Sequence, residues 1–224
     1  MLDSLRLSGW SRLSAAVIAS AGIASLLLAA WCDHVRSEGA NSAFDTVWHM
    51  ARFFTNLTNL LVAVAFMDAA VRGRWRTGGL VTAMTLWLSV VGSVYYLLLA
   101  KDHNPQGALF VTSLLHHAII PVAVFLFWLT AAPRLPITFR QPLLWALWPL
   151  TYGIYSLARG LATGLYPYFF FDPRKIGWSG MAFSLIGFTG LFLVLGLIFR
   201  LTSNRVRRPL DIVAVTHPTI EIES

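Results

Sequence analysis

Two adjacent histidines within an apolar segment are the residues of this chain best suited to chemistry. His116 and His117 stand in FVTSLLHHAIIPVAVFLFWL, about nine residues inside its predicted beginning, a depth of about 13 Å at helical rise. A neutral imidazole takes up a proton near pH 7, and ionisable groups at membrane depth are candidates for a functional site. The structural alternative is a neutral His bonded to a neighbouring helix or to Thr112 or Ser113. Since adjacent positions differ by about 100°, we expect at most one of the pair to be wholly structural.

A second polar group opens the segment RFFTNLTNLLVAVAF. Thr55, Asn56 and Asn59 share one helical face, because residues four apart stack and neighbours differ by about 100°. A threonine hydroxyl becomes a nucleophile when a base removes its proton, and asparagine amides can donate hydrogen bonds to an oxyanion. The triplet 56–58 also matches a glycosylation acceptor, but that modification needs an exposed loop, so we interpret the match as chance.

A third polar residue, Arg159, lies in TYGIYSLARGLATGLYPYFFFDP, one turn after Tyr155. Arginine keeps its proton, and its fork suits carboxylates. We therefore expect Arg159 and Tyr155 to bind a substrate group or an oxyanion, with pairing to Asp172 as one alternative and snorkelling to the outer interface as another.

The residue types limit the chemistry. Paired carboxylates of the glycosidase kind are missing, and the loop residues His49, Asp102 and His103 are too scattered for a metal constellation. We expect no metal and no cofactor. Acyl transfer or ester hydrolysis is what the side chains allow.

The elements that position these residues are membrane helices. Of the 224 residues, 57% are hydrophobic and only 12% are charged, against about 25% charged in soluble domains. Lipid offers no partners for backbone polar groups, so spans of about 20 residues are helices. We predict an all-α, polytopic bundle of six transmembrane helices. The expected spans are 13–32, 53–71, 77–100, 107–132, 141–163 and 176–199.

The distribution of basic residues orients the bundle. With the N-terminus inside, the cytoplasmic segments carry eleven Lys and Arg and the outer segments six, which follows the positive-inside rule. Both termini are then cytoplasmic, and the polar residues above fall in the outer half of the membrane. No basic, aromatic-interleaved face suggests nucleic acid. We predict one domain, 1–205, and a polar cytoplasmic tail, 206–224.

Several local features refine this prediction. The first apolar run could be a cleaved signal peptide, but 20 residues exceed the usual signal core of about 7–15, so we expect a retained helix. Residues 43–54 allow an amphipathic lead-in at the membrane surface before the second span. Tryptophans and tyrosines near span ends are interpreted as interfacial anchors. They are Trp10, Trp31, Trp48, Trp75, Tyr95, Tyr96, Tyr166, Tyr168 and Trp178.

Three segments resemble a known family: FFTNLTNLLVA, LLHHAIIPVAVFLFWL and WPLTYGIYSLARGLATGLYPYFFFD. They are similar to segments of the androgen-induced-gene family and of its bacterial six-helix relatives, the Pr-six-Pr membrane proteins, and the likeness covers most of the chain. Animal members are membrane-embedded threonine hydrolases that cleave fatty acid esters of hydroxy fatty acids. The resemblance implies Thr55 as nucleophile and a histidine of the fourth span as base.

The doubled histidine leaves two candidates for that base. The spacing to Pro121 matches the animal pattern for His116 and the bacterial pattern for His117, and we favour His116. The Asn-rich surroundings of Thr55 depart from the more apolar animal context, so the resemblance implies the fold more strongly than the substrate. The alternative to an intramembrane esterase is a non-catalytic membrane protein that binds or transports lipids or small molecules through the same polar cavity.

Overall fold

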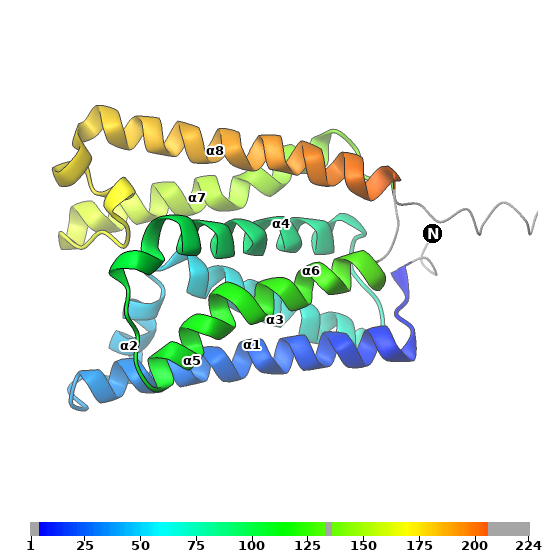
Figure 1. The fold of residues 1–224 in the computed structure, drawn as a ribbon, viewed down its shortest axis with the longest axis horizontal. Helices are drawn as coiled ribbons and strands as arrows, with labels where there is room; N and C mark the ends of the chain where they lie inside the picture. The colour runs from blue at the N-terminus through cyan, green and yellow to red at the C-terminus, as the bar shows by residue number, and fades with distance from the viewer. Residues whose placement is uncertain (1–4, 133–135, 206–224) are drawn as a thin grey trace, which may run out of the picture.

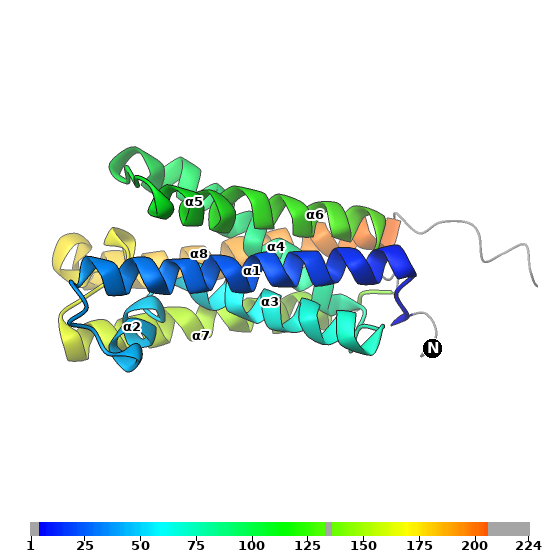
Figure 2. The same cartoon turned by 90° about the horizontal axis from the view of Figure 1, so that it is seen from below.

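The chain folds into a bundle of long antiparallel helices. The computed structural model describes residues 5–132 and 136–205. Within these ranges the elements are helices, and a single isolated bridge joins Arg6 and Arg74. Figures 1 and 2 show the chain passing back and forth along one axis, with the described N-terminal residues and the end of α8 at the same end of the bundle. The elements are α1 (Gly9–Arg36), α2 (Ala43–Met50), α3 (Phe54–Arg72), α4 (Gly79–Val94), the π-helix η2 (Tyr95–Leu99), the 3-10 helix η3 (Ala100–Asp102), α5 (Ala108–Leu114), the π-helix η4 (Leu115–Ile119), α6 (Ile120–Thr130), α7 (Arg140–Thr163), the 3-10 helix η5 (Phe169–Phe171) and α8 (Pro173–Arg205).

Five helical segments are long and apolar enough to cross a membrane. They are Gly9–Arg36, Phe54–Arg72, Gly79–Asp102, Ala108–Thr130 and Pro173–Arg205. The all-helical, multi-pass character predicted from the sequence is therefore confirmed for the described residues. The remaining long helix, α7, has 24 residues and packs along α8, but it is not one of the five. The count of six spans and the cytoplasmic location of both ends stay predictions, and the predicted tail 206–224 lies outside the described residues.

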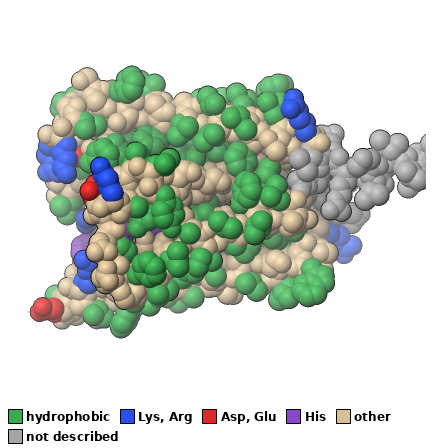
Figure 3. All heavy atoms as spheres, viewed as in Figure 1, with side chains coloured by type: hydrophobic (Ala, Val, Ile, Leu, Met, Phe, Trp, Pro, Cys, Tyr) green, Lys and Arg blue, Asp and Glu red, His purple; other side chains and the backbone are tan. Residues whose placement is uncertain are grey.

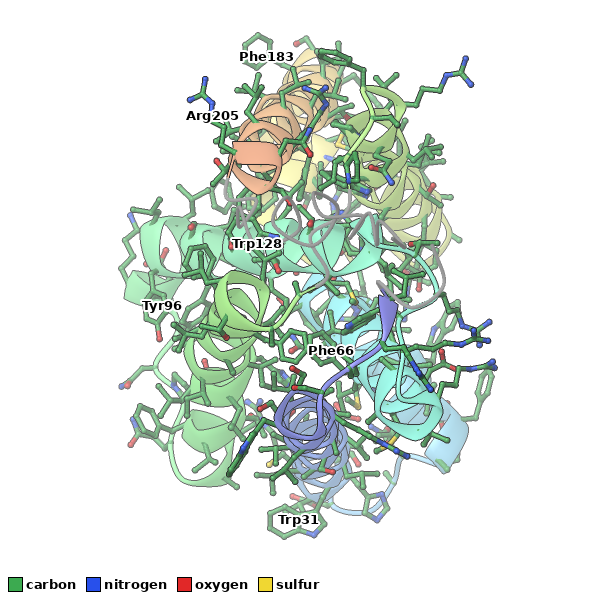
Figure 4. All side chains as sticks on the ribbon, turned by 90° about the vertical axis from the view of Figure 1, so that its right-hand side faces the viewer. Trp31, Phe66, Tyr96, Trp128, Phe183 and Arg205 are labelled. Atoms are coloured by element: carbon green, nitrogen blue, oxygen red, sulfur yellow. The ribbon has the colours of Figure 1, made fainter. Side chains whose placement is uncertain are left out.

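The surface and the interior differ as expected for a protein in lipid. Hydrophobic side chains cover the middle of the face shown in Figure 3, while Lys and Arg gather toward the two ends. Large apolar side chains such as Phe183, which is 80% exposed, point outward (Figure 4). Inside, Phe66 is fully buried, and its ring packs edge-on against Phe127 and Trp75 with centroids 5.1 and 5.0 Å away. The core at this end is thus a cluster of aromatic rings between α3, α6 and the loop before α4.

The amphipathic lead-in predicted before the second span is a separate helix, α2. Ser42 caps it and forms a reciprocal capping box with Asp45, which satisfies backbone donors at the helix start. The short segment 51–53 then turns the chain, and α3 begins at Phe54 without a side-chain cap. The break places the first turn of α3 toward the end of the bundle opposite the start of α1 and the end of α8 (Figure 1).

Two π-helical turns, η2 and η4, interrupt neighbouring spans at the same level. Pro121 has no N–H to donate to the carbonyl of His117 four residues earlier, and a missing bond of this kind loosens the regular ladder. On the facing helix, a Cβ at Gly92 would lie 2.7 Å from the His117 carbonyl oxygen. Glycine therefore permits backbone contact between α4 and η4. Single π turns often occur at functional sites.

Candidate functional site

Thr55 and His117 come together between α3 and η4. The Thr55 hydroxyl oxygen Oγ1 is 3.5 Å from Nε2 of His117, across 62 residues of sequence. Thr55 lies in the first turn of α3, and His117 lies in the π-helical turn that precedes α6. Both side chains are partly buried. A hydroxyl and an imidazole in this arrangement are the elements of a base-activated nucleophile.

The second nitrogen of His117 fixes the form of the ring. Nδ1 is 2.9 Å from the carbonyl oxygen of Ser113, and a carbonyl can only accept a hydrogen bond. Nδ1 therefore carries the proton, and Nε2 has a free lone pair directed at Thr55. The imidazole also stacks on Tyr95, with ring centroids 3.8 Å apart and planes 12° apart. These contacts hold the ring in one orientation.

Thr55 and His117 both line an apolar cavity. Its empty volume is about 520 Å³, counting space open to the surroundings. Aromatic and aliphatic side chains make up most of the lining, and ligand pockets of this kind bury hydrocarbon while a few polar groups fix orientation. The lining residues are Phe54, Thr55, Val90, Val91, Val94, Tyr95, Leu99, His117, Pro149, Tyr152, Tyr168, Phe170, Phe171, Phe188 and Phe192.

Two tyrosines, Tyr152 and Tyr168, line the cavity together with Thr55, near the start of α3. Tyr152 is 4% exposed and donates a hydrogen bond to the Arg52 carbonyl at 2.7 Å. Tyr168 comes from the loop before η5. Burial raises the pKa of the Tyr168 hydroxyl, while hydrogen bonds with the Thr55 side chain and with the Thr55 and Phe54 backbone act in the opposite direction. The phenol therefore stays protonated at neutral pH, and a neutral hydroxyl can donate to charge that develops near Thr55.

His116 points away from Thr55, toward α1. Its Nε2 is 2.9 Å from the hydroxyl of Ser25, and the residue is 4% exposed. Ser25 in turn donates to the Gly22 carbonyl at 2.8 Å, so its oxygen accepts the His116 proton. The preference for His116 as the base is therefore not what the geometry favours. Adjacent side chains diverge by about 100° around a helix, and here one faces α1 while the other faces the cavity.

The two asparagines beside Thr55 donate to main-chain carbonyls. Asn59 is 1% exposed, and its Nδ2 donates to the Thr55 carbonyl at 2.9 Å. Asn56 donates to the Met50 carbonyl at 3.0 Å and lines a different hollow, together with Asp33 and Arg52. Neither amide lines the Thr55 cavity. These contacts do not support the expected role of the two amides at an oxyanion. The Asn59 amide bonds within α3, and the Asn56 amide connects α3 to the end of α2.

Arg159 and Tyr155 hold α2 against α7. Arg159 is 6% exposed, donates to the Tyr155 hydroxyl at 2.7 Å and to the Trp48 carbonyl at 2.5 Å, and covers the Trp48 ring at 3.9 Å. Tyr155 donates to the Ala51 carbonyl at 3.2 Å. Neither residue lines the Thr55 cavity. Their contacts connect α7 to the segment that leads into α3 and do not support the expected role in substrate binding, which stays a prediction.

Asp172, the acidic partner considered for Arg159, pairs with Arg174 instead. The carboxylate accepts two hydrogen bonds from that guanidinium, at 2.9 and 2.8 Å. Hydrogen bonding to Arg174 holds the pKa of the Asp172 carboxyl below its usual value. Arg159 therefore makes its contacts with neutral groups and an aromatic ring.

Sequence reasoning missed Tyr95 and Tyr168, which were interpreted as interfacial anchors. Both lie at span ends in the sequence, as anchors do, but their rings face the cavity. Ser113 was recognised as a hydrogen-bond partner one turn before His117, and its carbonyl has that role. The position of Tyr95 opposite the histidine pair has no local signal in the sequence, because it depends on how α4 and η4 meet.

Comparison of the chain with protein-family models, with curated proteins and with solved structures finds no match. Within residues 5–132 and 136–205 no three His, Cys, Asp or Glu side chains form a group that could hold a metal ion. The interpretation of the site consequently depends on its own geometry and on the resemblance of the three segments.

Proposed function

We propose that this protein is an intramembrane lipid-ester hydrolase in which Thr55 is the nucleophile and His117 is the general base. The observation that carries the proposal is the 3.5 Å approach of Thr55 Oγ1 to His117 Nε2 in the wall of an apolar cavity. A catalytic hydrogen bond is often long in the absence of substrate and shortens in the complex. The Nδ1 proton donated to the Ser113 carbonyl leaves Nε2 as the acceptor that such a base needs.

The reaction follows from these positions. The Thr55 proton moves to Nε2 of His117 as Oγ1 bonds to the ester carbonyl carbon, and the carbonyl π electrons become an oxyanion. The Tyr168 hydroxyl, which lies beside Thr55, and the N–H groups in the first turn of α3, which has no side-chain cap, would donate to that oxyanion. The imidazolium then returns its proton to the leaving alkoxide, which departs as the alcohol. Water, deprotonated by His117, cleaves the acyl-threonine and releases the acid.

The cavity indicates the substrate class. Aromatic and aliphatic walls favour a long hydrocarbon chain, with the ester at the end occupied by Thr55 and His117. The resemblance of the three segments adds fatty acid esters of hydroxy fatty acids as the first substrates to test. We further propose six spans with both termini cytoplasmic, which puts the Thr55 site in the outer half of a bacterial plasma membrane.

The adjacent histidines provide a matched test. Purified protein in lipid nanodiscs would be assayed with a long-chain fluorogenic ester, and active-site labelling by a fluorophosphonate probe would be located by mass spectrometry. We expect hydrolysis and a probe adduct on Thr55, both lost in Thr55→Ala and reduced at least 100-fold in His117→Gln, a loss typical of removing a general base. His116→Gln is the control and should keep hydrolysis within a few-fold, provided that the protein stays folded.

The test also separates the enzyme from a lipid-binding protein, since apolar walls would serve binding equally well. Hydrolysis by Thr55→Ala at the level of the unchanged protein would reject the proposal. A protein that retains a fluorescent fatty acid ester, leaves it intact and takes no label would be a binder or transporter.

A further inference from the structure

A chain of hydrogen bonds runs from His117 to an exposed histidine at the end of the bundle. The hydroxyl of Ser113 lies 3.4 Å from Nδ1 of His117 and donates to the Tyr95 hydroxyl at 2.9 Å. The Tyr95 oxygen is 3.0 Å from Nδ1 of His103. Ser113 and Tyr95 are each 8% exposed, whereas His103 is exposed in the turn that follows η3. The buried imidazole beside Thr55 is thus connected to the solvent-facing end of the bundle by two hydroxyls.

The donors in this chain all point the same way. A hydroxyl has one proton and two lone pairs, so when Ser113 donates to Tyr95, the Tyr95 proton is free to be donated onward. Nδ1 of a neutral His103 accepts it. The lone pairs of the Ser113 hydroxyl then face the Nδ1 proton of His117, which also bonds the Ser113 carbonyl. The direction of donation along these hydrogen bonds is therefore linked to the position of the proton on His117.

We propose that Tyr95 and His103 are positioning residues that, together with the Ser113 carbonyl, hold His117 in the tautomer with its proton on Nδ1, and that protonation of His103 weakens this preference. The consequence for catalysis depends on the proposed function, because only the Nδ1-protonated form can accept the Thr55 proton at Nε2. The tautomer itself does not depend on that function.

The weaker preference follows from the inventory of donors. A protonated imidazole carries N–H at both nitrogens, so Nδ1 of His103 would donate to the Tyr95 oxygen. The Tyr95 proton would then turn toward Ser113, and the Ser113 proton toward Nδ1 of His117. Two protons would face one another there. The Ser113 carbonyl would remain the acceptor of the Nδ1 proton, but the form of His117 with its proton on Nε2, which cannot act as a base toward Thr55, would gain in population.

The neighbours of His103 do not prevent this change in the direction of the hydrogen bonds. Its ring meets Tyr95 edge-on, with centroids 5.8 Å apart and planes 89° apart. Besides Tyr95 on η2 and His117 on η4, the titratable or charged groups beside it are Lys101 and Asp102 of η3. Within the described ranges no ion pair with His103 is present.

The experiment reads the tautomer directly. Nitrogen-15 NMR of histidine-labelled protein in nanodiscs would follow His117, assigned with His117→Gln, between about pH 5 and 8, where histidines titrate. We expect Nδ1 protonation at the upper end and a growing Nε2-protonated fraction on acidification. Tyr95→Phe keeps the stacked ring and removes the hydroxyl, and His103→Ala removes the exposed imidazole. Each should abolish the pH-dependent change. His34→Ala, which removes an exposed histidine bonded to Asn41, is the control and should preserve it.

Turnover provides a second readout that separates this inference from the proposed function. If hydrolysis depends on Thr55, the pH at which it is lost on acidification should depend on His103. In His103→Ala the loss should come only from protonation of His117 itself and should be displaced to lower pH. A His117 tautomer that is the same in the unchanged protein, Tyr95→Phe and His103→Ala at every pH would overturn the inference, whether or not the protein is an esterase. A pH-responsive tautomer without hydrolysis would overturn the proposed function and leave the inference intact.

Discussion

The carbonyl oxygen of His117 occupies space that a side chain on Gly92 would need. A Cβ built at Gly92 lies 2.7 Å from that oxygen, closer than such atoms approach in proteins, and the obstacle is backbone. The imidazole of His117 is therefore placed by a backbone contact between α4 and η4 as well as by its own hydrogen bonds.

Gly92→Ala should displace η4 and separate His117 from Thr55. A shift of about 1 Å at reacting groups can cost about 100-fold in rate, so we expect a loss of hydrolysis of that order, with a lowered melting temperature. The control is Gly187→Ala on α8, where a Cβ meets nothing within 4 Å. There the helix propensity of alanine should stabilise the protein by about 0.5–1 kcal/mol. Equal activity in the two variants would show that the contact does not position the base.

Thr58 and Thr55 belong to the same helix but should respond differently to replacement by valine. Thr58 is fully buried, and its hydroxyl accepts the indole N–H of Trp148 at 3.1 Å. Thr58→Val leaves that N–H without its partner, at a cost of about 1–3 kcal/mol in the free energy of unfolding, while hydrolysis persists. Thr55→Val should abolish hydrolysis with a smaller change in stability. Denaturant unfolding and ester turnover, measured on both variants, check the contrast.

Ser25 and His116 join α1 to η4, and their coupling should be structural. Ser25→Ala removes the acceptor of the buried Nε2 proton of His116, which should cost about 1–3 kcal/mol. In the background of His116→Leu the same change should cost much less, because no imidazole remains unpaired. A double-mutant cycle on thermal unfolding measures the difference. Additive effects of the two changes would contradict this role of His116.

The ion pair at the start of α8 should make stability depend on pH. Arg174 holds the pKa of the Asp172 carboxyl below its usual value, and the carboxylate is nearly buried, with its side chain 6% exposed. A lowered folded-state pKa stabilises the protein above the unfolded value near about 3.9 and loses that contribution as pH falls through the folded value. Melting temperatures measured from about pH 6 to 3 should fall less steeply for Asp172→Asn than for the unchanged protein. Parallel curves would mean that this pair does not contribute.

The sequence predicts the bundle well because the membrane imposes length and hydropathy on every span. The expected span 141–163 lies within Arg140–Thr163, and 53–71 is shifted by one residue from Phe54–Arg72. The expected span 13–32 is exceeded by Gly9–Arg36, because polar residues continue a helix beyond the hydrocarbon. The rotation of each helix about its own axis, which decides what a given side chain faces, is predicted less well. Hydropathy does not distinguish the imidazole that faces α1 from the one that faces the cavity.

The polar residues around Thr55 show where prediction from the sequence ends. Asn56, Asn59 and Arg159 were expected to bind substrate because membrane-embedded polar groups need partners. They do have partners, but the partners are carbonyls of the 48–55 region, exposed by the turn between α2 and α3. Carbonyls near the break between α2 and α3 therefore accept hydrogen bonds from these side chains. In a continuous helix, the same side-chain donors would remain available to a ligand. Tyr168, a donor that does line the cavity, comes from the loop between α7 and η5. The path of a loop cannot be predicted from the spacing of apolar residues in the sequence.

The π-helical turn η4 contains one residue more than a regular helix would use over the same rise. Deleting Ala118 would let α5 and α6 join as an ordinary helix, with everything before the deletion rotated by about 100° relative to α6. His116 would then stand four residues before Pro121, in the place that His117 occupies now. A shortened chain of this kind would put His116 in the place of His117 and His117 in the place that Ala118 occupies now. An insertion or deletion could therefore switch which histidine faces the cavity.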